Sequence, residues 1–252
     1  MRTPLVLLVG LLLVGGAAAD PDDTGWGPDM HHEFPDDYAY RDCTVYVYND
    51  GMSEAERIQS LGYTVTVGYD MSYATISGYD VVFIPLIGPG GLSGYEDDIE
   101  QYVAEGGGLW IHQPNGYGWV DYAPPGFEFN VTDIFYCYPY EGNRIVDAGH
   151  PTMAGLAASD LVGRFDTVYI TDLGSGYGLI ADGYPDCATD VHCAAGIYGE
   201  CGKVFMDLGN LNPGSFWPGS NQYIINIIDW LCTGGFTPAD SDTWGTIKEM
   251  FK

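Results

Sequence analysis

YDVVFIPLIGPGGLSGYEDDIEQYVAEGGGLWIHQPNG, residues 79–116, is the stretch of this 252-residue chain that decides the fold. Two short apolar runs, residues 80–87 and 108–112, enclose a segment in which apolar side chains recur at helical spacing from Ile99 onward. The pattern predicts a strand, a helix and a second strand. Because parallel strands require a crossover connection of this kind, the stretch predicts an α/β domain with a buried parallel sheet.

The chain before this stretch shows the same alternation of strands and helices. A strand at residues 43–48 leads into a helix at residues 53–62, where Ser53 and Glu56 have the spacing of a capping box. A second strand follows at residues 64–67. Later in the chain, strands are predicted at residues 166–171, 177–181, 194–198 and 203–208, and a closing amphipathic helix at residues 221–232.

Residues 117–140 interrupt the alternation, because aromatic residues and prolines crowd there and only residues 127–138 have a strand pattern. We interpret this region as an insertion over the ends of the strands. The order of elements predicts a flavodoxin-like three-layer sandwich with a mostly parallel sheet and a β-rich insertion.

The amino-terminal segment has the features of a secretory signal peptide. A single Arg2 precedes an apolar run at residues 5–14, and small residues then lead to a cleavage site after Ala19. The run is too short for a membrane span, so the sequence predicts a secreted protein, extracellular or periplasmic. The predicted segments are a signal peptide (1–19), an acidic linker or arm (20–42), an α/β domain (43–233) and a tail with a short amphipathic helix (234–252).

The chain is strongly acidic, with a formal net charge of -27 at pH 7. Such a surface repels nucleic acid, which is therefore excluded as a partner. Clustered carboxylates attract calcium, so calcium stays open as a bound ion, and no other cofactor is predicted.

The six cysteines are an even number in an oxidising compartment, which favours disulfides over metal binding. The spacing of the cysteines does not indicate which of them pair with one another in disulfides. Cys187 and Cys193 are the favoured local bridge, because PDCATDVHC has the composition of a loop between strands.

The order of several motifs resembles the class I glutamine amidotransferase-like superfamily, and within it the trehalose-utilisation (ThuA-like) branch. The resemblance covers residues 43–232. The motifs, in chain order, are YDVVFIP (79–85), YVAEGGGLWIH (102–112), GHPTMAGL (149–156), GKVFMDLGNL (202–211) and NIIDWL (226–231). In that branch a glycine triplet precedes a strand that ends in His, and a His-Pro turn follows later.

Catalytic amidotransferases of the superfamily carry a nucleophilic Cys on the sharp turn after the strand that corresponds to residues 108–112. This chain has His112, Gln113, Pro114 and Asn115 there, and none of its cysteines. A thiolate nucleophile needs an exposed turn and an adjacent base. The resemblance therefore implies the scaffold, whereas the residues argue against glutaminase or cysteine peptidase activity.

A polar site is predicted where the parallel strands end, because ligands in open α/β sheets bind outside the carboxyl ends of the strands. His112 and His150 are the acid or base candidates, since histidine titrates near neutrality. With Asp207 they would also form a known metal-ligand set, but their spacing gives no support and no metal is predicted. Trp110 is a further candidate stacking face beside the predicted ligand-binding residues, which are Gly90, Gly91, Gln113, Asn115, Tyr117, Trp119, Asp207 and Asn210.

Three functions fit these observations. The first is a secreted, catalytically degenerate amidotransferase-like domain that binds a small polar ligand such as a carbohydrate, or an extracellular protein or glycan. The second is a ThuA-like carbohydrate-active enzyme that uses His112 and His150. The third, suggested by 20 tyrosines and 36 glycines, is a structural component of an extracellular surface. The sequence does not indicate an oligomeric state.

Overall fold

The computed structural model describes residues 42–48, 52–85, 91–113, 118–133, 143–161, 168–182, 191–209, 211 and 219–233. All of them lie in one unit, Ala39–Lys252. The predicted signal peptide, the tail after residue 233 and all but the last residue of the predicted arm lie outside the described residues. Within the described part, no helix is long and apolar enough to cross a membrane.

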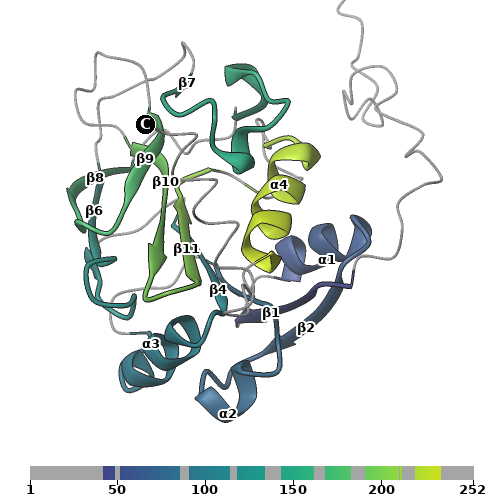
Figure 1. Cartoon of the computed structure of the whole chain (residues 1–252), viewed down its shortest axis with the longest axis vertical. Helices are drawn as coiled ribbons and strands as arrows, with labels where there is room; N and C mark the ends of the chain where they lie inside the picture. Colours follow the sequence, from purple (N-terminus) through teal and green to yellow (C-terminus); the bar gives the residue numbers. More distant parts are fainter. Residues whose placement is uncertain are drawn as a thin grey trace, which may run out of the picture. The chain divides into compact units, whose positions relative to one another are not determined.

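The main sheet has eight strands in the order β2-β1-β3-β4-β11-β10-β9-β7 (Figure 1). Its first five strands are parallel to one another, and their order is that of flavodoxin-like sheets. They are β1 (Thr44–Tyr48), β2 (Thr64–Gly68), β3 (Val81–Ile84), β4 (Gly108–His112) and β11 (Gly202–Asp207). The predicted α/β sandwich is confirmed.

Six strands separate β4 from β11 in the sequence, and two of them lie within residues 117–140, the range of the predicted insertion. Three of them extend the main sheet in the antiparallel sense: β7 (Arg144–Ile145), β9 (Gly178–Asp182) and β10 (Val191–Tyr198). The other three form a separate antiparallel sheet: β5 (Gly118–Val120), β6 (Phe129–Asp133) and β8 (Val168–Leu173). The six strands thus widen the main sheet and add a second one.

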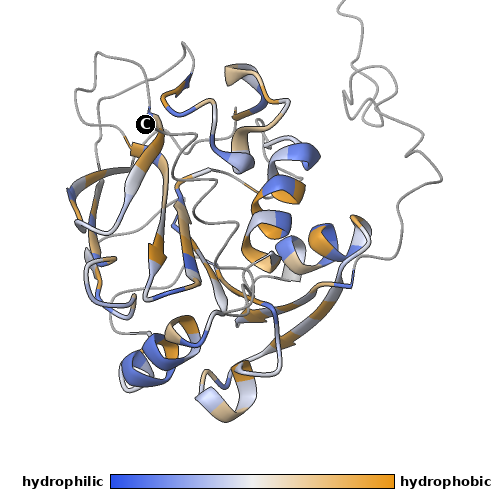
Figure 2. Ribbon diagram, viewed as in Figure 1, coloured by the Kyte–Doolittle hydropathy of each residue, from blue (hydrophilic) through white to orange (hydrophobic). Residues whose placement is uncertain are grey.

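Helices cover both faces of the main sheet. One face carries α1 (Met52–Ser60), α4 (Asn221–Cys232) and the 3-10 turns η1 (Pro151–Met153) and η2 (Ala158–Leu161). The opposite face carries α2 (Tyr73–Ile76), α3 (Glu96–Ala104) and the small sheet. Apolar and polar residues alternate around α1 and α4 in Figure 2, as expected of helices with one buried face.

The period of two along each strand assigns side chains to these two cores. On β1, Val45 and Val47 belong to the core under α1 and α4, whereas Tyr46 and Tyr48 belong to the core under α3. The central parallel strands β1, β3, β4 and β11 are buried on both faces, which explains their apolar runs. The edge strand β2 is largely exposed.

Gly202, at the start of β11, allows a close approach between that strand and the end of α3. A Cβ at this position would lie 1.9 Å from the backbone oxygen of Val103. We expect Gly202→Ala to lower the free energy of unfolding by about 1–3 kcal/mol through overpacking, measured by urea denaturation. Gly178→Ala in β9 is the control, because its Cβ would meet its nearest neighbour at an ordinary 3.6 Å. Equal stabilities of the two variants would contradict this packing.

Two local predictions are wrong. Helix α1 begins at Met52, so Ser53 lies inside its first turn, where its hydroxyl donates to Glu54 and does not cap the helix with Glu56. The predicted Cys187–Cys193 bridge is also wrong, because Cys193 is a free thiol buried in β10 rather than a loop residue. The observed bridge joins Cys43 to Cys232, from the residue before β1 to the end of α4. Cys187 itself lies outside the described residues.

Candidate functional site

The carboxyl ends of β4 and β11 bring His112 and Asp207 together. The two strands are adjacent and parallel, and their register pairs these two residues. The imidazole Nδ1–H donates to Asp207 Oδ1 at 2.6 Å. His112 is 1% exposed and Asp207 0% exposed, so the pair lies within the protein, on the α4 side of the sheet.

Two further donors satisfy the Asp207 carboxylate. The indole nitrogen of Trp110 donates to Oδ1 at 3.3 Å, and the hydroxyl of Tyr223, on the first turn of α4, donates to Oδ2 at 3.1 Å. Burial raises the pKa of Tyr223 well above its ordinary value, so its hydroxyl keeps the proton that it donates. A buried carboxylate is tolerated only with such partners. We call His112, Asp207, Trp110 and Tyr223 the Asp207 network.

Strand β10 adds a thiol beside this network. Cys193 pairs with Asp207 in the antiparallel register and shares a hydrogen bond with Tyr223. Burial raises the pKa of Cys193, so the thiol stays protonated and is a poor nucleophile. On the same strand, His192 is buried and its Nδ1 lies 2.8 Å from the amide oxygen of Asn143.

The turn after β4 carries an amide side chain, that of Gln113. Gln113 is buried, and its backbone N–H donates to the Asp207 carbonyl at 2.9 Å. Its side-chain nitrogen donates to the hydroxyl of Tyr122 at 3.1 Å. This side chain is thus held inside the protein by hydrogen bonds.

The other predicted ligand-binding residues are distributed as follows. Trp119 lies on β5 and is 52% exposed, so its ring face is accessible. Gly91 is exposed, and its carbonyl accepts from the Tyr48 hydroxyl at 3.4 Å. Trp110 is fully buried with its ring 4.6 Å from Phe83, so it offers no stacking face to a ligand. Four predicted residues lie outside the described part: Gly90, Asn115, Tyr117 and Asn210.

His150 does not join the His112–Asp207 pair. It precedes η1, and its ring packs on Trp230 with 4.9 Å between centroids. Trp230 lies near the end of α4, where its carbonyl accepts from Lys203 Nζ at the start of β11. His150 therefore lies toward the opposite end of β11 from Asp207. Among the described residues, no group of three or more His, Cys, Asp or Glu side chains is arranged to hold a metal ion.

Burial of the His150 ring predicts a pH-dependent stability. It lowers the pKa of His150 from 6.5 to about 4, and Nδ1 accepts from the Thr152 N–H, which protonation would prevent. Between these pH values the unfolded chain binds a proton that the folded chain does not, so stability falls as the pH is lowered through this window. The His150 ring is partly exposed, and after allowance for this we expect the free energy of unfolding to fall by about 1–2 kcal/mol.

The check is a comparison with His150→Asn, which keeps an N-cap acceptor but does not titrate. Urea denaturation at pH 7 and at pH 4.5 should show a smaller loss in the variant than in the parent protein. Equal losses of stability in the variant and in the parent protein would mean that His150 does not contribute to the pH dependence.

Sequence reasoning missed Tyr223, Cys193, His192 and Asn143. Tyr223 precedes the apolar stripe of α4, and its helical spacing to Ile227 was the available signal that it faces the sheet. Cys193 and His192 belong to an antiparallel strand whose register with β11 has no local signature in the sequence.

Several solved structures share the fold of this chain. A GMP synthase-like protein from Thermoplasma acidophilum matches over 82% of this chain and 98% of its own, with 11% identity and a TM-score of 0.53. A cytoplasmic protein from Salmonella typhimurium matches over 75% of this chain and 98% of its own, with 13% identity and a TM-score of 0.51. A ThuA-like protein from Parabacteroides merdae matches over 76% of this chain and 90% of its own, with 14% identity and a TM-score of 0.50.

These likenesses show that the chain shares its α/β fold with a GMP synthase-like protein and a ThuA-like protein. At such low identities they show the fold alone. No protein-family model and no curated protein matches the sequence.

Proposed function

We propose that this chain is a secreted, non-catalytic amidotransferase-like domain that binds a small polar ligand, with carbohydrates as the first class to test. The observation that carries the proposal is the turn after β4. Gln113 there is buried and hydrogen-bonded, and Cys193, the thiol beside Asp207, is buried and protonated. An amidotransferase nucleophile needs an exposed thiolate.

The Asp207 network supports a binding role because its hydrogen bonds join the carboxyl ends of β4 and β11 to each other and to α4. Its donors and acceptors are engaged with one another inside the protein. Trp119 follows β4 by a few residues and exposes the kind of aromatic face on which sugars stack. The Cys43–Cys232 bridge supports secretion, because disulfides persist in oxidising compartments.

The test has two measurements on the protein expressed without residues 1–19. Ammonia release from glutamine should equal the blank, and calorimetry against neutral sugars and cell-wall fragments should find at least one ligand. Trp119→Ala should weaken its binding at least about tenfold, as expected when an aromatic stacking face is lost. Tyr69→Ala is the control, since Tyr69 is exposed beside the edge strand β2. Glutamine hydrolysis above the blank, or no ligand in the panel, would overturn the proposal.

A second candidate is a ThuA-like carbohydrate-active enzyme, which the His112–Asp207 pair favours. A carboxylate on Nδ1 fixes the imidazole tautomer and leaves Nε2 as the basic nitrogen, as in hydrolase triads. His112→Gln should then abolish a sugar-directed activity that His150→Asn leaves unchanged, because His150 lies apart from the pair. Absence of any such activity in the parent protein removes this candidate.

A further inference from the structure

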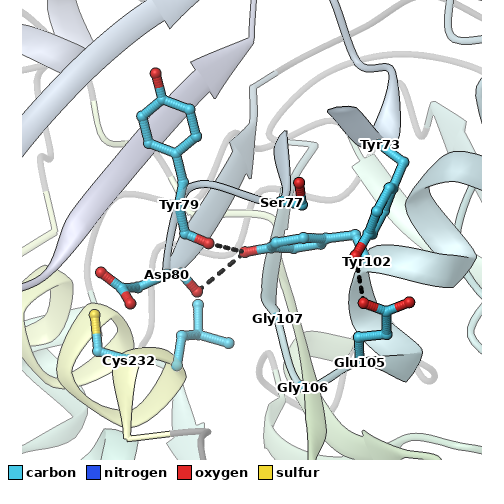
Figure 3. Close-up of a pocket in the computed structure, with 10 residues that line it drawn as sticks. Tyr73, Ser77, Tyr79, Asp80, Tyr102, Glu105, Gly106, Gly107 and Cys232 are labelled. Carbon is cyan, nitrogen blue, oxygen red and sulfur yellow. Dashed lines mark hydrogen bonds between the residues drawn. The ribbon is translucent and has the colours of Figure 1, made fainter. Parts of the chain in front are cut away.

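A pocket of about 230 Å³ lies at the amino ends of β3 and β4, away from the Asp207 network (Figure 3). Hydrogen bonds within the protein engage its tyrosine hydroxyls. That of Tyr102 donates to the Asp80 carbonyl at 3.0 Å, and that of Tyr73 donates to Glu105, as Figure 3 shows. These contacts hold the end of α3 against the strands, so the pocket has a structural role.

The small sheet of β5, β6 and β8 carries a motif that the proposed function does not use. Asn130, Val131 and Thr132 on β6 form an N-glycosylation sequon. The sequence contains no other Asn followed two residues later by Ser or Thr. A sequon is used only in a chain that enters the secretory pathway, and residues 1–19 have the features of a signal peptide. The motif therefore indicates a single attachment site for a glycan.

The side chain of Asn130 points away from the core. Its neighbours Phe129 and Val131 are buried in the core under α3. The period of two along a strand then places Asn130 on the outer face of the small sheet, where it is partly exposed. Within the described part of the chain, its side-chain amide has no hydrogen-bond partner. A group attached to this amide would extend into solvent and leave the core undisturbed.

Trp119 faces Asn130 across the sheet. The antiparallel register of β5 and β6 pairs these two residues directly. Side chains paired in this way have Cβ atoms about 4.5–5.5 Å apart. Trp119 is 52% exposed, so its ring is within reach of a group attached to its neighbour. On the other side of Asn130, β8 places the exposed Asp172, whose carboxylate can accept from sugar hydroxyls. The outer face thus offers an aromatic surface and a hydrogen-bond acceptor to a sugar at Asn130.

We propose that Asn130 carries an N-linked glycan whose first sugar packs on Trp119. The donor is an oligosaccharide linked to a lipid pyrophosphate, and the transferase of the secretory compartment catalyses the step. The side-chain nitrogen Nδ2 of Asn130 attacks C1 of the first sugar, and the bond from C1 to the pyrophosphate oxygen breaks. The lipid pyrophosphate leaves with the electron pair of that bond, and Nδ2 loses one proton.

The inference rests on the secretion proposed above, and it uses the ring that the proposed function assigns to a free sugar. An attached glycan would occupy the Trp119 ring, so the glycosylated chain should bind a free sugar more weakly than the unmodified chain. The calorimetry proposed above uses protein expressed without residues 1–19, which does not enter the secretory pathway and carries no glycan. A failure to find a free ligand there is therefore distinct from a failure of glycosylation.

The experiment is expression of the full chain in a yeast that glycosylates its secreted proteins, followed by mass measurement of the secreted protein. Digestion with peptide N-glycosidase should remove the mass of one glycan. Asn130→Gln and Thr132→Ala should each abolish this shift, whereas Thr132→Ser keeps the hydroxyl of the sequon and should retain it. Thr171→Ala is the control and should also retain the shift, because Thr171 is exposed on β8 and belongs to no sequon.

Packing on Trp119 is measured on secreted protein trimmed by endoglycosidase H to its first N-acetylglucosamine. This protein should melt about 2–4 °C above the Asn130→Gln variant, because the sugar covers apolar surface. In a Trp119→Ala background the difference should fall below about 1 °C. A Tyr69→Ala background is the control and should keep the difference, because Tyr69 is exposed beside the edge strand β2.

A secreted protein without the mass shift would overturn the glycosylation site. An equal melting difference in the parent and Trp119→Ala backgrounds would overturn the contact with the ring. Residues 20–252 behind the yeast's own leader keep the site testable if the full chain stays in the cells. Retention of the full chain would contradict the proposed secretion, whereas a leader-driven chain without a glycan would overturn the site itself.

Discussion

Asp207→Ala is expected to lower the free energy of unfolding by about 3–5 kcal/mol, because three buried donors lose their acceptor and each unsatisfied group costs about 1–3 kcal/mol. The substitution removes the acceptor for His112, Trp110 and Tyr223 at once, and all three donors are buried. Each buried donor without a partner carries a desolvation penalty, and the lost carboxylate leaves a small cavity.

Urea denaturation followed by tryptophan fluorescence measures this effect. Asp97→Ala, an exposed acidic residue in the first turn of α3, is the matched control and should change stability by less than about 1 kcal/mol. Asp207→Asn keeps one acceptor oxygen, so its stability should lie between those of Asp207→Ala and Asp97→Ala. If Asp207→Ala were as stable as the control, the network would not be part of the folded core.

Removal of the Cys43–Cys232 bridge is expected to have the largest effect on stability. The two cysteines are 189 residues apart in the sequence, so the bridge closes a loop of nearly the whole domain. The loop-entropy relation gives about 5 kcal/mol for such a loop, as an upper value. The double variant Cys43→Ser, Cys232→Ser should therefore unfold at a much lower urea concentration than the parent protein.

Cys201→Ser is the control, because Cys201 is a free, partly exposed thiol and its loss should change stability by less than about 0.5 kcal/mol. Reduction of the parent protein with dithiothreitol should lower its urea denaturation midpoint to that of the double variant. A midpoint unchanged by both treatments would show that the bridge does not constrain the unfolded chain.

Local periodicity explains the parts of the fold that could be predicted. The strand at residues 108–112 coincides with β4, and the final helix coincides with α4 (Asn221–Cys232). The signal is a short continuous apolar run after a glycine triplet in β4, and an apolar spacing of 3.6 residues in α4. The His112–Asp207 contact then follows from the rule that adjacent parallel strands end together.

The remaining features depend on pairings that no local pattern encodes. Cys193 has the composition of a loop around it, yet antiparallel pairing of β10 with β11 buries it beside Asp207. His150 was predicted to lie near His112 because both are histidines. In the structure η1 packs on α4, and His150 lies against Trp230 instead. The pocket at the amino ends of the strands has no signal in the sequence, because the strand-end rule directs attention to the opposite edge.

The Cys43–Cys232 bridge also determines how the domain carries mechanical load. It joins the residue before β1 to the last residue of α4, so a pulling force applied through both flanks passes through the covalent bond and bypasses the sheet. While the bridge is intact, stretching the chain in an atomic force microscope cannot separate β1 from its neighbours. After reduction, the same force would shear the parallel strands of a chain segment 189 residues long.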